Sequence, residues 1–297
     1  MKVKNKLPMN CGPVLARIFS ASVIGELAAK GRSPIAAGLL KEARLYREID
    51  PATQLCDFFD QVHALLFRSY RNEYIYKNAI ARKILLGVHS LNTASMLTEF
   101  RAGACKADAV VLNGTSTVYE IKSEYDGMNR LTRQIAAYRK IFDRINVITS
   151  DSQLDNVARV IGDDIGLMVL TDRYTISTMR EPSSLKGSVR AEVIFDSLRR
   201  SEYEQIIKNH FGEVPQVSNG RIYQACRGLF NVLDPAVAHD SMVATLKKRD
   251  NSQRLRDFVL SMPESLTAVS LSCKLGVAGK ARFSQVLNTS IEGCLAG

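Results

Sequence analysis

The sequence predicts an α/β (α+β) fold in which a mixed β-sheet is flanked by helices, with helical extensions at both ends of the chain. Two short, valine-rich segments, 106–112 and 117–122, are separated by Asn113-Gly114, a pair of residues typical of β-hairpin turns. Further short apolar segments then alternate with helical ones, as in a sheet covered by helices. Near both ends of the chain, apolar residues recur at helical spacing instead.

The N-terminal part of the chain, 13–90, is predicted to be helical. Residues 22–43 favour two short helices broken at Gly31 and Pro34. These helices form either a helix-turn-helix or, as the preferred interpretation, a plain helical pair packed on the core. Over residues 54–86, apolar residues again recur at helical spacing, and the second half of this segment is basic.

The central part is predicted to alternate strands and helices. The predicted strands are 95–101, 106–112, 117–122, 145–149, 166–171 and 174–179, with helices starting near 130 and 153. The turn-forming residues Glu181-Pro182-Ser183-Ser184 mark a boundary, and helices are expected after it. The predicted organisation is a helical N-terminal region (1–64), a central sheet region (65–182) and a helical C-terminal region (183–297).

Three charged residues are predicted to meet on the hairpin. Because side chains alternate along a strand, Glu120 and Lys122 share one face while Ile121 points to the other. A three-residue loop, 113–115, would place Asp108 directly opposite Glu120. Facing carboxylates repel unless a proton or cation lies between them, and hard oxygen ligands suit Mg²⁺. The hairpin therefore predicts a magnesium centre, with Lys122 beside it to position a water or neutralise a charged transition state.

The spacing of these residues resembles a known nuclease signature. Asp108, eleven intervening residues and Glu120-Ile121-Lys122 resemble the motif of the PD-(D/E)XK nuclease superfamily, although Ala107 replaces the usual proline. Gln134 and Tyr138 on the next predicted helix resemble the QxxxY element of its RecB-like branch. The resemblance covers residues 65–182 and implies a restriction-endonuclease-like fold. The pattern of the whole chain is similar to that of uncharacterised bacterial and phage members of this superfamily.

The resemblance implies a Mg²⁺- or Mn²⁺-dependent nuclease that hydrolyses phosphodiester bonds and leaves a 5′-phosphate and a 3′-hydroxyl. The residues with implied roles are the metal ligands Asp108, Glu120 and the backbone carbonyl of Ile121, the water-assisting Lys122, and the orienting pair Gln134 and Tyr138. The resemblance also implies DNA as the substrate, with RNA less expected, and a role in phage defence, mobile elements or repair.

Two further acids could complete the site. A helix before the first strand often carries an extra glutamate in this superfamily, and Glu73 is the best match. It could equally form an ion pair with Lys77, four residues on. Glu99 could be another metal ligand or hold a water, and Arg101, which shares its face by strand alternation, could contact a phosphate. The alternative for Glu99 and Arg101 is a salt bridge at the end of the strand.

A basic helix face is predicted beside the site. At about 100° per residue, the cations after residue 130 fall on one stripe next to the QxxxY pair. The predicted nucleic-acid contacts on this stripe are Arg130, Arg133, Lys140 and Arg144. A basic stripe suits a phosphate backbone, and the alternative is a solvated amphipathic helix.

The composition is that of a globular protein with a polyanionic partner. The net charge of +10 and the pI near 9.4 favour nucleic acid first and an anionic membrane surface second. With 46% apolar and 24% charged residues, the chain can bury a core. Its six scattered cysteines argue against a zinc site and for a reduced cytoplasm, and no apolar segment is long enough for a transmembrane helix.

Three other functions are compatible with the sequence. The chain could be a nucleic-acid-binding protein that lacks catalysis, a regulator built on the N-terminal helix-turn-helix, or a structural protein in which the ExK motif occurs by chance. If each chain has one active site, cutting both strands of a duplex would most simply use a homodimer. A partner protein could supply targeting.

Overall fold

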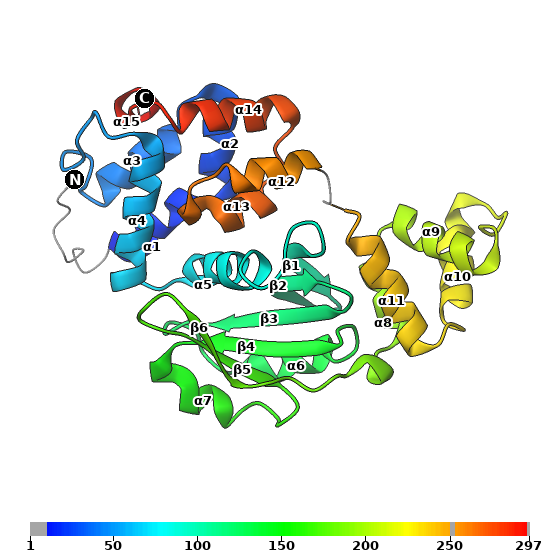
Figure 1. Cartoon of the computed structure of the whole chain (residues 1–297). Helices are drawn as coiled ribbons and strands as arrows, with labels where there is room; N and C mark the ends of the chain where they lie inside the picture. Colours follow the sequence, from blue (N-terminus) through cyan, green and yellow to red (C-terminus); the bar gives the residue numbers. More distant parts are fainter. Residues whose placement is uncertain (1–10, 250–252, 296–297) are drawn as a thin grey trace. The chain divides into compact units, whose positions relative to one another are not determined.

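The computed structural model describes residues 11–249 and 253–295 (Figure 1). The chain divides into two compact units. The first unit combines both ends of the sequence, Met1–Arg82 and Ser252–Gly297, and the second is the continuous segment Lys83–Asn251. These units do not coincide with the predicted regions 1–64, 65–182 and 183–297, because the last helices fold together with the first ones.

The described part of the first unit is helical apart from an isolated β-bridge between Gln54 and Ser290. Its helices are α1 (Cys11–Ala16), α2 (Ala21–Lys30), α3 (Pro34–Glu42), α4 (Leu55–Ser69), α5 (Glu73–Ala79), α12 (Gln253–Leu260), α13 (Thr267–Ser272), α14 (Val277–Val286) and α15 (Ile291–Leu295), with 3₁₀ turns η1 (Arg17–Phe19) and η5 (Glu264–Leu266). A π-helix, η2 (Ile80–Leu85), leads from α5 into the second unit.

Helices α2 and α3 confirm the predicted break at Gly31 and Pro34. Gly31 ends α2 with a φ of 73°, and Ser33 caps α3 by accepting a hydrogen bond from the Ala36 backbone N–H at 3.1 Å. The only cation within α3 is Lys41. A recognition helix needs several polar side chains that reach base edges. The structure therefore favours the plain helical pair over a DNA-reading helix-turn-helix.

Hydrogen bonds join the two ends of the sequence within the first unit. The Cys56 backbone N–H at the start of α4 donates to the carbonyl of Leu287 at 2.9 Å. The buried Asn78 side chain of α5 donates to the carbonyl of Glu264 at 2.9 Å and accepts from the Ala268 backbone N–H at 3.0 Å. The C-terminal helices are therefore part of the same packed core as the N-terminal ones.

The predicted helix over 54–86 is interrupted at residues 70–72, where α4 ends and α5 begins. Glu73 is the first residue of α5 and forms the ion pair with Lys77 that the sequence offers as its alternative role. Glu73 belongs to the first unit, and its role as an extra catalytic acid stays a prediction.

No single helix in the described residues is long and apolar enough to cross a membrane. The bent pair Cys11–Phe19 and Ala21–Lys30, with 49° between its halves, meets the length and composition requirements only when taken together. Its apolar side chains, among them Leu15, Ile18 and Leu27, are buried within the protein.

The second unit is built on a six-stranded mixed sheet with the strand order β1-β2-β3-β4-β5-β6 (Figure 1). The strands are β1 (Ser95–Ala102), β2 (Cys105–Leu112), β3 (Ser116–Lys122), β4 (Arg144–Thr149), β5 (Gly166–Leu170) and β6 (Ile176–Arg180). Strands β1 to β3 run antiparallel, β3 to β5 run parallel, and β6 returns antiparallel. This sheet, flanked by helices, confirms the predicted fold class.

The hairpin between β2 and β3 has the predicted register. Leu112 pairs with Ser116, so that the loop consists of residues 113–115. The Asn113 backbone N–H donates to the carbonyl of Thr115 at 3.0 Å. Gly114 has a φ of 70°, a left-handed conformation that glycine adopts without steric cost. The loop therefore fixes which residues of β3 face β2.

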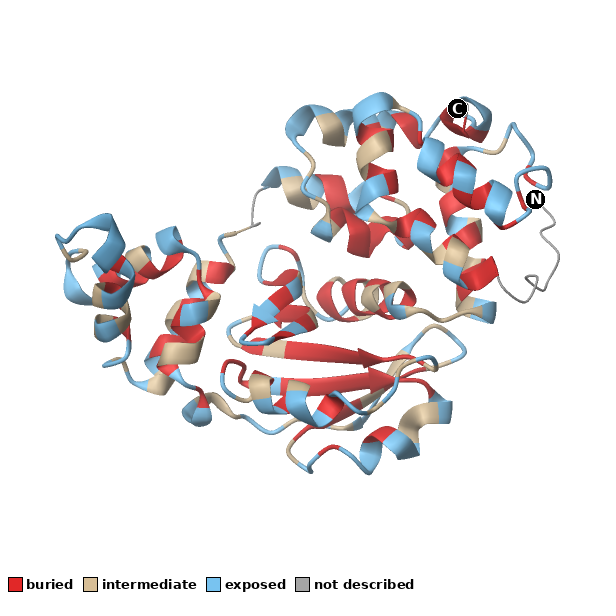
Figure 2. Ribbon diagram, turned by 180° about the vertical axis from the view of Figure 1, so that it is seen from behind, coloured by how far each residue is buried: buried red, intermediate tan, exposed pale blue. Residues whose placement is uncertain are grey.

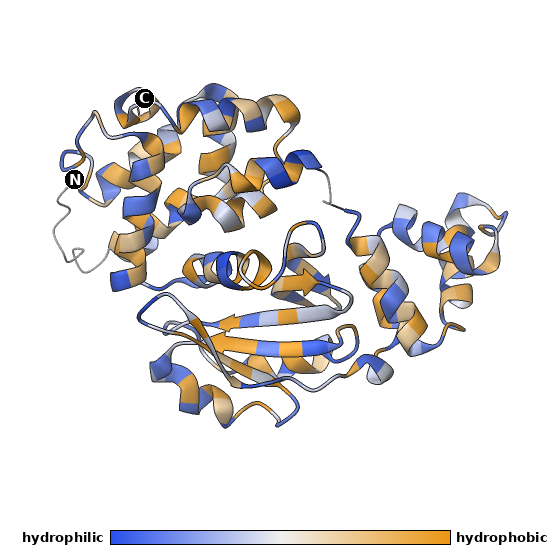
Figure 3. Ribbon diagram, in the orientation of Figure 1, coloured by the Kyte–Doolittle hydropathy of each residue, from blue (hydrophilic) through white to orange (hydrophobic). Residues whose placement is uncertain are grey.

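Helix α6 (Leu131–Tyr138) connects the parallel strands β3 and β4 and packs on the sheet. Its buried residues Leu131, Ile135 and Tyr138 belong to one apolar cluster with Val110 and Val118 of the hairpin. The central strands β3 and β4 are buried along most of their length (Figure 2). They nevertheless carry hydrophilic residues (Figure 3). Buried polar groups of this kind need partners, and they mark the part of the sheet where chemistry can be expected.

Helix α6 ends before the predicted basic stripe is complete. Its last residue is Tyr138, and the chain beyond it is held by a distant segment, since the carbonyl of Lys140 accepts a hydrogen bond from the Arg190 backbone N–H at 2.9 Å. Arg144 is the first residue of β4. The predicted stripe is therefore wrong in its second half, because Lys140 and Arg144 do not lie on the helix.

The second unit also contains α7 (Leu154–Ala158), α8 (Ala191–Ser197), α9 (Arg200–Phe211), α10 (Asn219–Phe230) and α11 (Pro235–Leu246), and the 3₁₀ turns η3 (Asp151–Gln153) and η4 (Lys186–Ser188). Some of the positive charge between residues 191 and 249 serves the fold. Arg227 pairs with Asp196 at 3.1 Å, and Arg249 pairs with Glu202 at 2.5 Å. These cations are therefore already neutralised within the unit.

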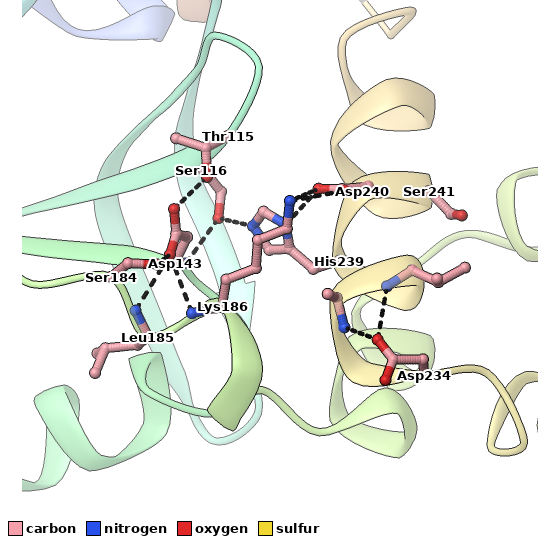
Figure 4. A network of polar contacts seen from close by, with 12 residues as sticks. Thr115, Ser116, Asp143, Ser184, Leu185, Lys186, Asp234, His239, Asp240 and Ser241 are labelled. Atoms are coloured by element: carbon pink, nitrogen blue, oxygen red, sulfur yellow. Dashed lines mark hydrogen bonds and ion pairs between the residues drawn. The ribbon is translucent and has the colours of Figure 1, made fainter.

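A buried carboxylate organises the turn that follows α6. Asp143 is 4% exposed and accepts hydrogen bonds from the hydroxyls of Thr115 and Ser184, at 2.6 and 2.5 Å, and from the backbone N–H groups of Leu185 and Lys186, at 3.2 and 3.0 Å (Figure 4). Burial acts to raise the pKa of Asp143, but the hydrogen bonds from Ser184 and Thr115 outweigh it and hold the pKa below its usual value.

A second polar chain joins β3 to α11. The Ser116 hydroxyl lies 2.7 Å from His239 Nε2, His239 Nδ1 lies 3.1 Å from Asp240, and Asp240 pairs with Lys186 at 2.6 Å (Figure 4). Burial lowers the pKa of His239, which favours the neutral ring. The serine, histidine and aspartate follow the order of a hydrolase triad, but Ser116 and His239 are both 0% exposed. These hydrogen bonds fasten α11 to the sheet.

Candidate metal-dependent active site

Strand β3 places a glutamate and a lysine side by side in the core. Glu120 and Lys122 are two residues apart and therefore point to the same face of the sheet. They are 1% and 4% exposed, and Lys122 Nζ lies 2.9 Å from Glu120 Oε1. Removing two charges from water is costly unless they are paired and hydrogen-bonded. The site therefore depends on further polar partners.

Helix α6 supplies those partners. Gln134 and Tyr138 are four residues apart and lie on one side of the helix. Gln134 Oε1 accepts a hydrogen bond from Lys122 Nζ at 3.0 Å, and the Tyr138 hydroxyl lies 2.7 Å from Glu120 Oε2 and 2.8 Å from the carbonyl of Lys106. The structure thus brings the QxxxY pair and the ExK pair into one network.

The tyrosine in this network acts as a hydrogen-bond donor. Burial, and then the charge and hydrogen bond of Glu120, raise the pKa of Tyr138 far above its ordinary value. Its hydroxyl therefore stays protonated and can donate its proton to Glu120 or to the carbonyl of Lys106. Tyr138 is fully buried, and its hydroxyl contacts Glu120 directly.

Asp108 lies where the hairpin register predicts it. The last paired residues are Ala109 and Tyr119, so the next position of the register sets Asp108 against Glu120. The half-buried Asp108 side chain accepts a hydrogen bond from the Ile121 backbone N–H at 2.8 Å. This contact holds the first acid of the motif against the strand that carries the second. A role for the Ile121 carbonyl as a metal ligand stays a prediction.

Glu99 is the residue of β1 that faces Asp108. Thr98 pairs with Ala109 and Phe100 pairs with Ala107. Glu99 and Asp108 lie between these two pairs and are not themselves a regular pair of the ladder. Glu99 has a φ of 54°, which is rare for a residue with a Cβ and often occurs at functional sites. One carboxylate oxygen of Glu99 lies within 4.8 Å of one of Asp108.

The left-handed backbone conformation of Glu99 allows a test of the pair that it forms with Asp108. Replacing Glu99 by glycine is expected to raise the free energy of unfolding by about 0.5–1 kcal/mol, because glycine removes the steric cost of a positive φ. The same change is expected to weaken Mn²⁺ binding by removing a carboxylate. Urea unfolding and Mn²⁺ titration by electron paramagnetic resonance measure the two effects. Glu99→Gln is the control that keeps the backbone strain. A less stable Glu99→Gly variant would contradict the left-handed conformation.

The predicted nucleic-acid contacts are only partly brought together. Arg130 directly precedes α6 without a side-chain capping hydrogen bond, Arg133 lies in the first turn of the helix, and both are exposed. Lys140 and Arg144 are exposed outside the helix. The Arg101 side chain donates to the carbonyl at residue 103 of its own turn at 3.3 Å, and its contact with phosphate stays a prediction.

The sequence did not predict the groups that hold the end of β3 next to the site. The Thr149 hydroxyl donates to the carbonyl of Lys122 at 2.7 Å and fixes the end of β3. Ser123 follows at once, and both its backbone N–H and its hydroxyl donate to Asp126, at 3.0 and 2.6 Å. A serine and an aspartate three residues apart, directly after the ExK motif, are a local turn signal. This signal could have predicted the hydrogen bonds from Ser123 to Asp126.

The donor set fits a hard divalent cation. Glu99 and Asp108 bring carboxylate oxygens within 4.8 Å of each other, whereas Glu120 does not join them at this distance in the described residues. Carboxylate oxygens suit Mg²⁺ or Mn²⁺ and not a soft metal. Both oxygens of Glu120 are engaged by Lys122 and Tyr138, so a metal ligated by Glu120 would have to share or replace these contacts.

Comparison with known proteins identifies a phage family. A family model described as Bacteriophage P4 protein cII matches residues 67–269, a range that contains every candidate site residue. Protein cII of Enterobacteria phage P4 is 25% identical over 111 residues, which cover 36% of this chain and 41% of that protein. The alignment thus spans less than half the length of this curated relative.

Among solved structures, the SPO1766 protein of unknown function from Silicibacter pomeroyi is similar with 14% identity and a TM-score of 0.31. The similarity covers 57% of this chain and 98% of that protein. A similarity at this level assigns neither the fold nor a function.

Proposed function

This chain belongs to the bacteriophage P4 protein cII family, and we propose that it is a metal-dependent nuclease that hydrolyses phosphodiester bonds of DNA. The observation that carries the proposal is the buried pair of Glu120 and Lys122, held by Gln134 and Tyr138 beside Asp108. A buried ion pair is seldom needed for stability, since apolar residues of similar volume often serve the fold as well or better. Its presence at the centre of the sheet supports a chemical role.

The proposed mechanism uses each member of the network. Asp108 and Glu120 would hold Mg²⁺ or Mn²⁺, with Glu99 and the carbonyl of Ile121 as further oxygen ligands. When bound, the metal neutralises phosphate charge and lowers the pKa of a bound water. Lys122 would donate hydrogen bonds to the attacking water or to a phosphate oxygen as negative charge develops.

Gln134 and Tyr138 would act as positioning residues. Gln134 accepts one of the three hydrogen atoms of the Lys122 ammonium, and Tyr138 fixes one oxygen of Glu120. Lys122 therefore keeps a donor available for substrate while its direction is set. Such support from rigid elements is what a precise catalytic group requires.

The proposed substrate is DNA, with RNA as the less expected alternative. The net charge of +10 favours a polyanion. Arg130 and Arg133 add exposed cations at the start of the helix that carries Gln134, and neither forms an ion pair with an acid of the described residues. These charges would contact phosphates without selecting a sequence.

The experiment that tests the proposal is a cleavage assay on circular single-stranded, supercoiled and branched DNA, with Mg²⁺ or Mn²⁺ compared with EDTA. Wild type is expected to cut only with metal, and Asp108→Ala and Lys122→Ala are expected to lose activity by about 100-fold or more. Denaturing gels of end-labelled products measure the cutting and identify the new ends.

Matched controls separate catalysis from folding. Asp155→Ala and Lys208→Ala remove an exposed acid and an exposed lysine of the same unit, and both variants are expected to cut as wild type does. Binding of DNA without cutting by wild type in any metal would instead support the binding protein that lacks catalysis. Cutting that persists in Lys122→Ala would refute the assigned role of the ExK motif.

A further inference from the structure

Three helical segments in the C-terminal part of the first unit have the order and the connections of a helix-turn-helix (Figure 1). α12 is followed by η5 and α13, which together cover residues 264–272, and then by α14. The connection before α14, residues 273–276, ends with Gly276, which precedes the helix in an extended conformation. A helix-turn-helix joins its two helices by a turn of three or four residues that often contains glycine. The second helix of such a motif would here be α14.

One side of α14 is packed against the rest of the first unit. Phe283 is 0% exposed, and its ring centroid lies 6.5 Å from that of Phe258 in α12. Gly279 faces α2, where a Cβ added to this glycine would lie 3.8 Å from the Cβ of Ala28. Val286 is buried as well. Because Gly279, Phe283 and Val286 recur at helical spacing, the opposite side of α14 faces solvent.

The solvent-facing side of α14 carries two polar side chains among small ones. The exposed residues that form this stripe are Ala278, Ala281, Arg282 and Gln285. The two alanines leave room for a partner to approach the helix closely. Arg282 donates one hydrogen bond to the carbonyl of Ala29, and four of its five N–H groups are left for other acceptors. The stripe therefore presents a guanidinium and an amide side by side.

The charge around this stripe is positive. Residues 265–291 contain three cations and no aspartate or glutamate. Lys274 is exposed in the turn before α14. Lys30 and Arg32 are exposed on either side of Gly31, a residue that adjoins the end of α14. These three cations form no ion pair with an acid of the described residues. A polyanion lying along α14 would thus meet positive charge at both ends of the helix.

Helix-turn-helix domains bind duplex DNA by placing the second helix in the major groove. In that groove arginine can pair with guanine and glutamine with adenine. From the geometry of α14 we propose that this helix enters the major groove, where Arg282 and Gln285 contact base edges. The flanking cations, Lys274, Lys30 and Arg32, bind phosphates of the backbone. This inference goes beyond the proposed nuclease and does not depend on it, because it assigns the selection of a DNA sequence to the first unit.

The first test selects DNA sequences. The full chain, in EDTA to prevent cutting, is mixed with a library of random-sequence DNA duplexes, and the bound duplexes are sequenced. Wild type is expected to enrich one short sequence motif. Gln285→Ala is expected to relax the base preference at the position that the glutamine contacts. Since Gln285 is exposed, the variant is expected to keep the unfolding midpoint of wild type, which circular dichroism measures.

The second test compares affinities by fluorescence anisotropy in EDTA, on the selected duplex and on a scrambled duplex of the same composition. Gln285→Ala is expected to weaken binding to the selected duplex about 10-fold and to the scrambled duplex less than about twofold. Lys274→Ala is expected to weaken both equally and to reduce the slope of log affinity against log salt by about 0.9. Arg47→Ala removes an exposed arginine of the same unit outside α12 to α14, and as the matched control it is expected to stay within about twofold of wild type.

Several outcomes would overturn the inference. A library from which wild type enriches no motif would exclude sequence reading, and an unchanged motif in Gln285→Ala with unchanged affinity would exclude α14 as the reading helix. Metal-dependent cutting by a chain that selects no sequence would overturn the inference while leaving the nuclease in place. Conversely, selective binding that depends on Gln285, together with no cutting in any metal, would sustain the helix-turn-helix and count against the nuclease.

Discussion

Replacing Lys122 by methionine is expected to lower the free energy of unfolding by about 3 kcal/mol, because it leaves the Glu120 carboxylate buried without its cation. Glu120 is 1% exposed, and the only positive charge in hydrogen-bonding contact with it in the described residues is Lys122, at 2.9 Å. Methionine fills similar volume, so the loss measures the missing charge and not a cavity. Urea unfolding at neutral pH, followed by circular dichroism, is the measurement.

The double variant Glu120→Gln with Lys122→Met separates charge from packing. It removes both members of the pair, and its stability is expected to return most of the way to that of wild type, since a buried ion pair often gains little over neutral groups. Neither variant is expected to cut DNA. Equal stability of the single and the double variant would show that the two side chains are not coupled, and would undermine the argument from their burial.

Replacing Asp143 by alanine is expected to cost about 1–3 kcal/mol, because it leaves several part-buried donors without their acceptor. The hydroxyls of Thr115 and Ser184 and the N–H groups of Leu185 and Lys186 all donate to this carboxylate. Asp143→Asn keeps one acceptor oxygen, and its loss is expected to be smaller. A loss below about 1 kcal/mol in the alanine variant would mean that water or another group accepts these bonds.

The same residue predicts a pH dependence. The pKa of folded Asp143 lies below its reference value of 3.8, so its carboxylate stabilises the fold above about pH 4. That contribution is lost as the pH falls through the lower, folded-state pKa. Unfolding midpoints between pH 7 and pH 3 are therefore expected to fall more steeply at the acid end in wild type than in Asp143→Asn.

Much of the candidate site follows from local rules of the sequence. Asn113-Gly114 specifies a short hairpin loop, and the loop sets Asp108 in register with Glu120. Strand alternation then places Glu120 and Lys122 on one face, and helical spacing places Gln134 and Tyr138 on one side of α6; that this side meets the pair is implied only by the resemblance to the nuclease motif. Each step depends on neighbours within a few residues, and for this reason it can be predicted without the fold.

Other features depend on distant parts of the chain. The apolar spacing of α6 continues past Tyr138, so the sequence could not show that contacts from residues 185–190 end the helix and redirect Lys140. The left-handed backbone of Glu99 is equally invisible, because glutamate carries no signal for a positive φ. The pairing of the first and last helices into one unit also lacks a local pattern, since it depends on contacts between the two ends of the chain.

That pairing sets an order of events during biosynthesis. The second unit is continuous in sequence and can fold once it has left the ribosome, whereas the first unit lacks α12 to α15 until synthesis has passed residue 252. Synthesis proceeds at roughly 5–20 residues per second, so the apolar faces of α2 and α4 stay uncovered for on the order of ten seconds before the C-terminal helices are made. Nascent chains are therefore most exposed to chaperones and proteases through their N-terminal helices, and premature termination before α12 leaves α2 without its partner α14.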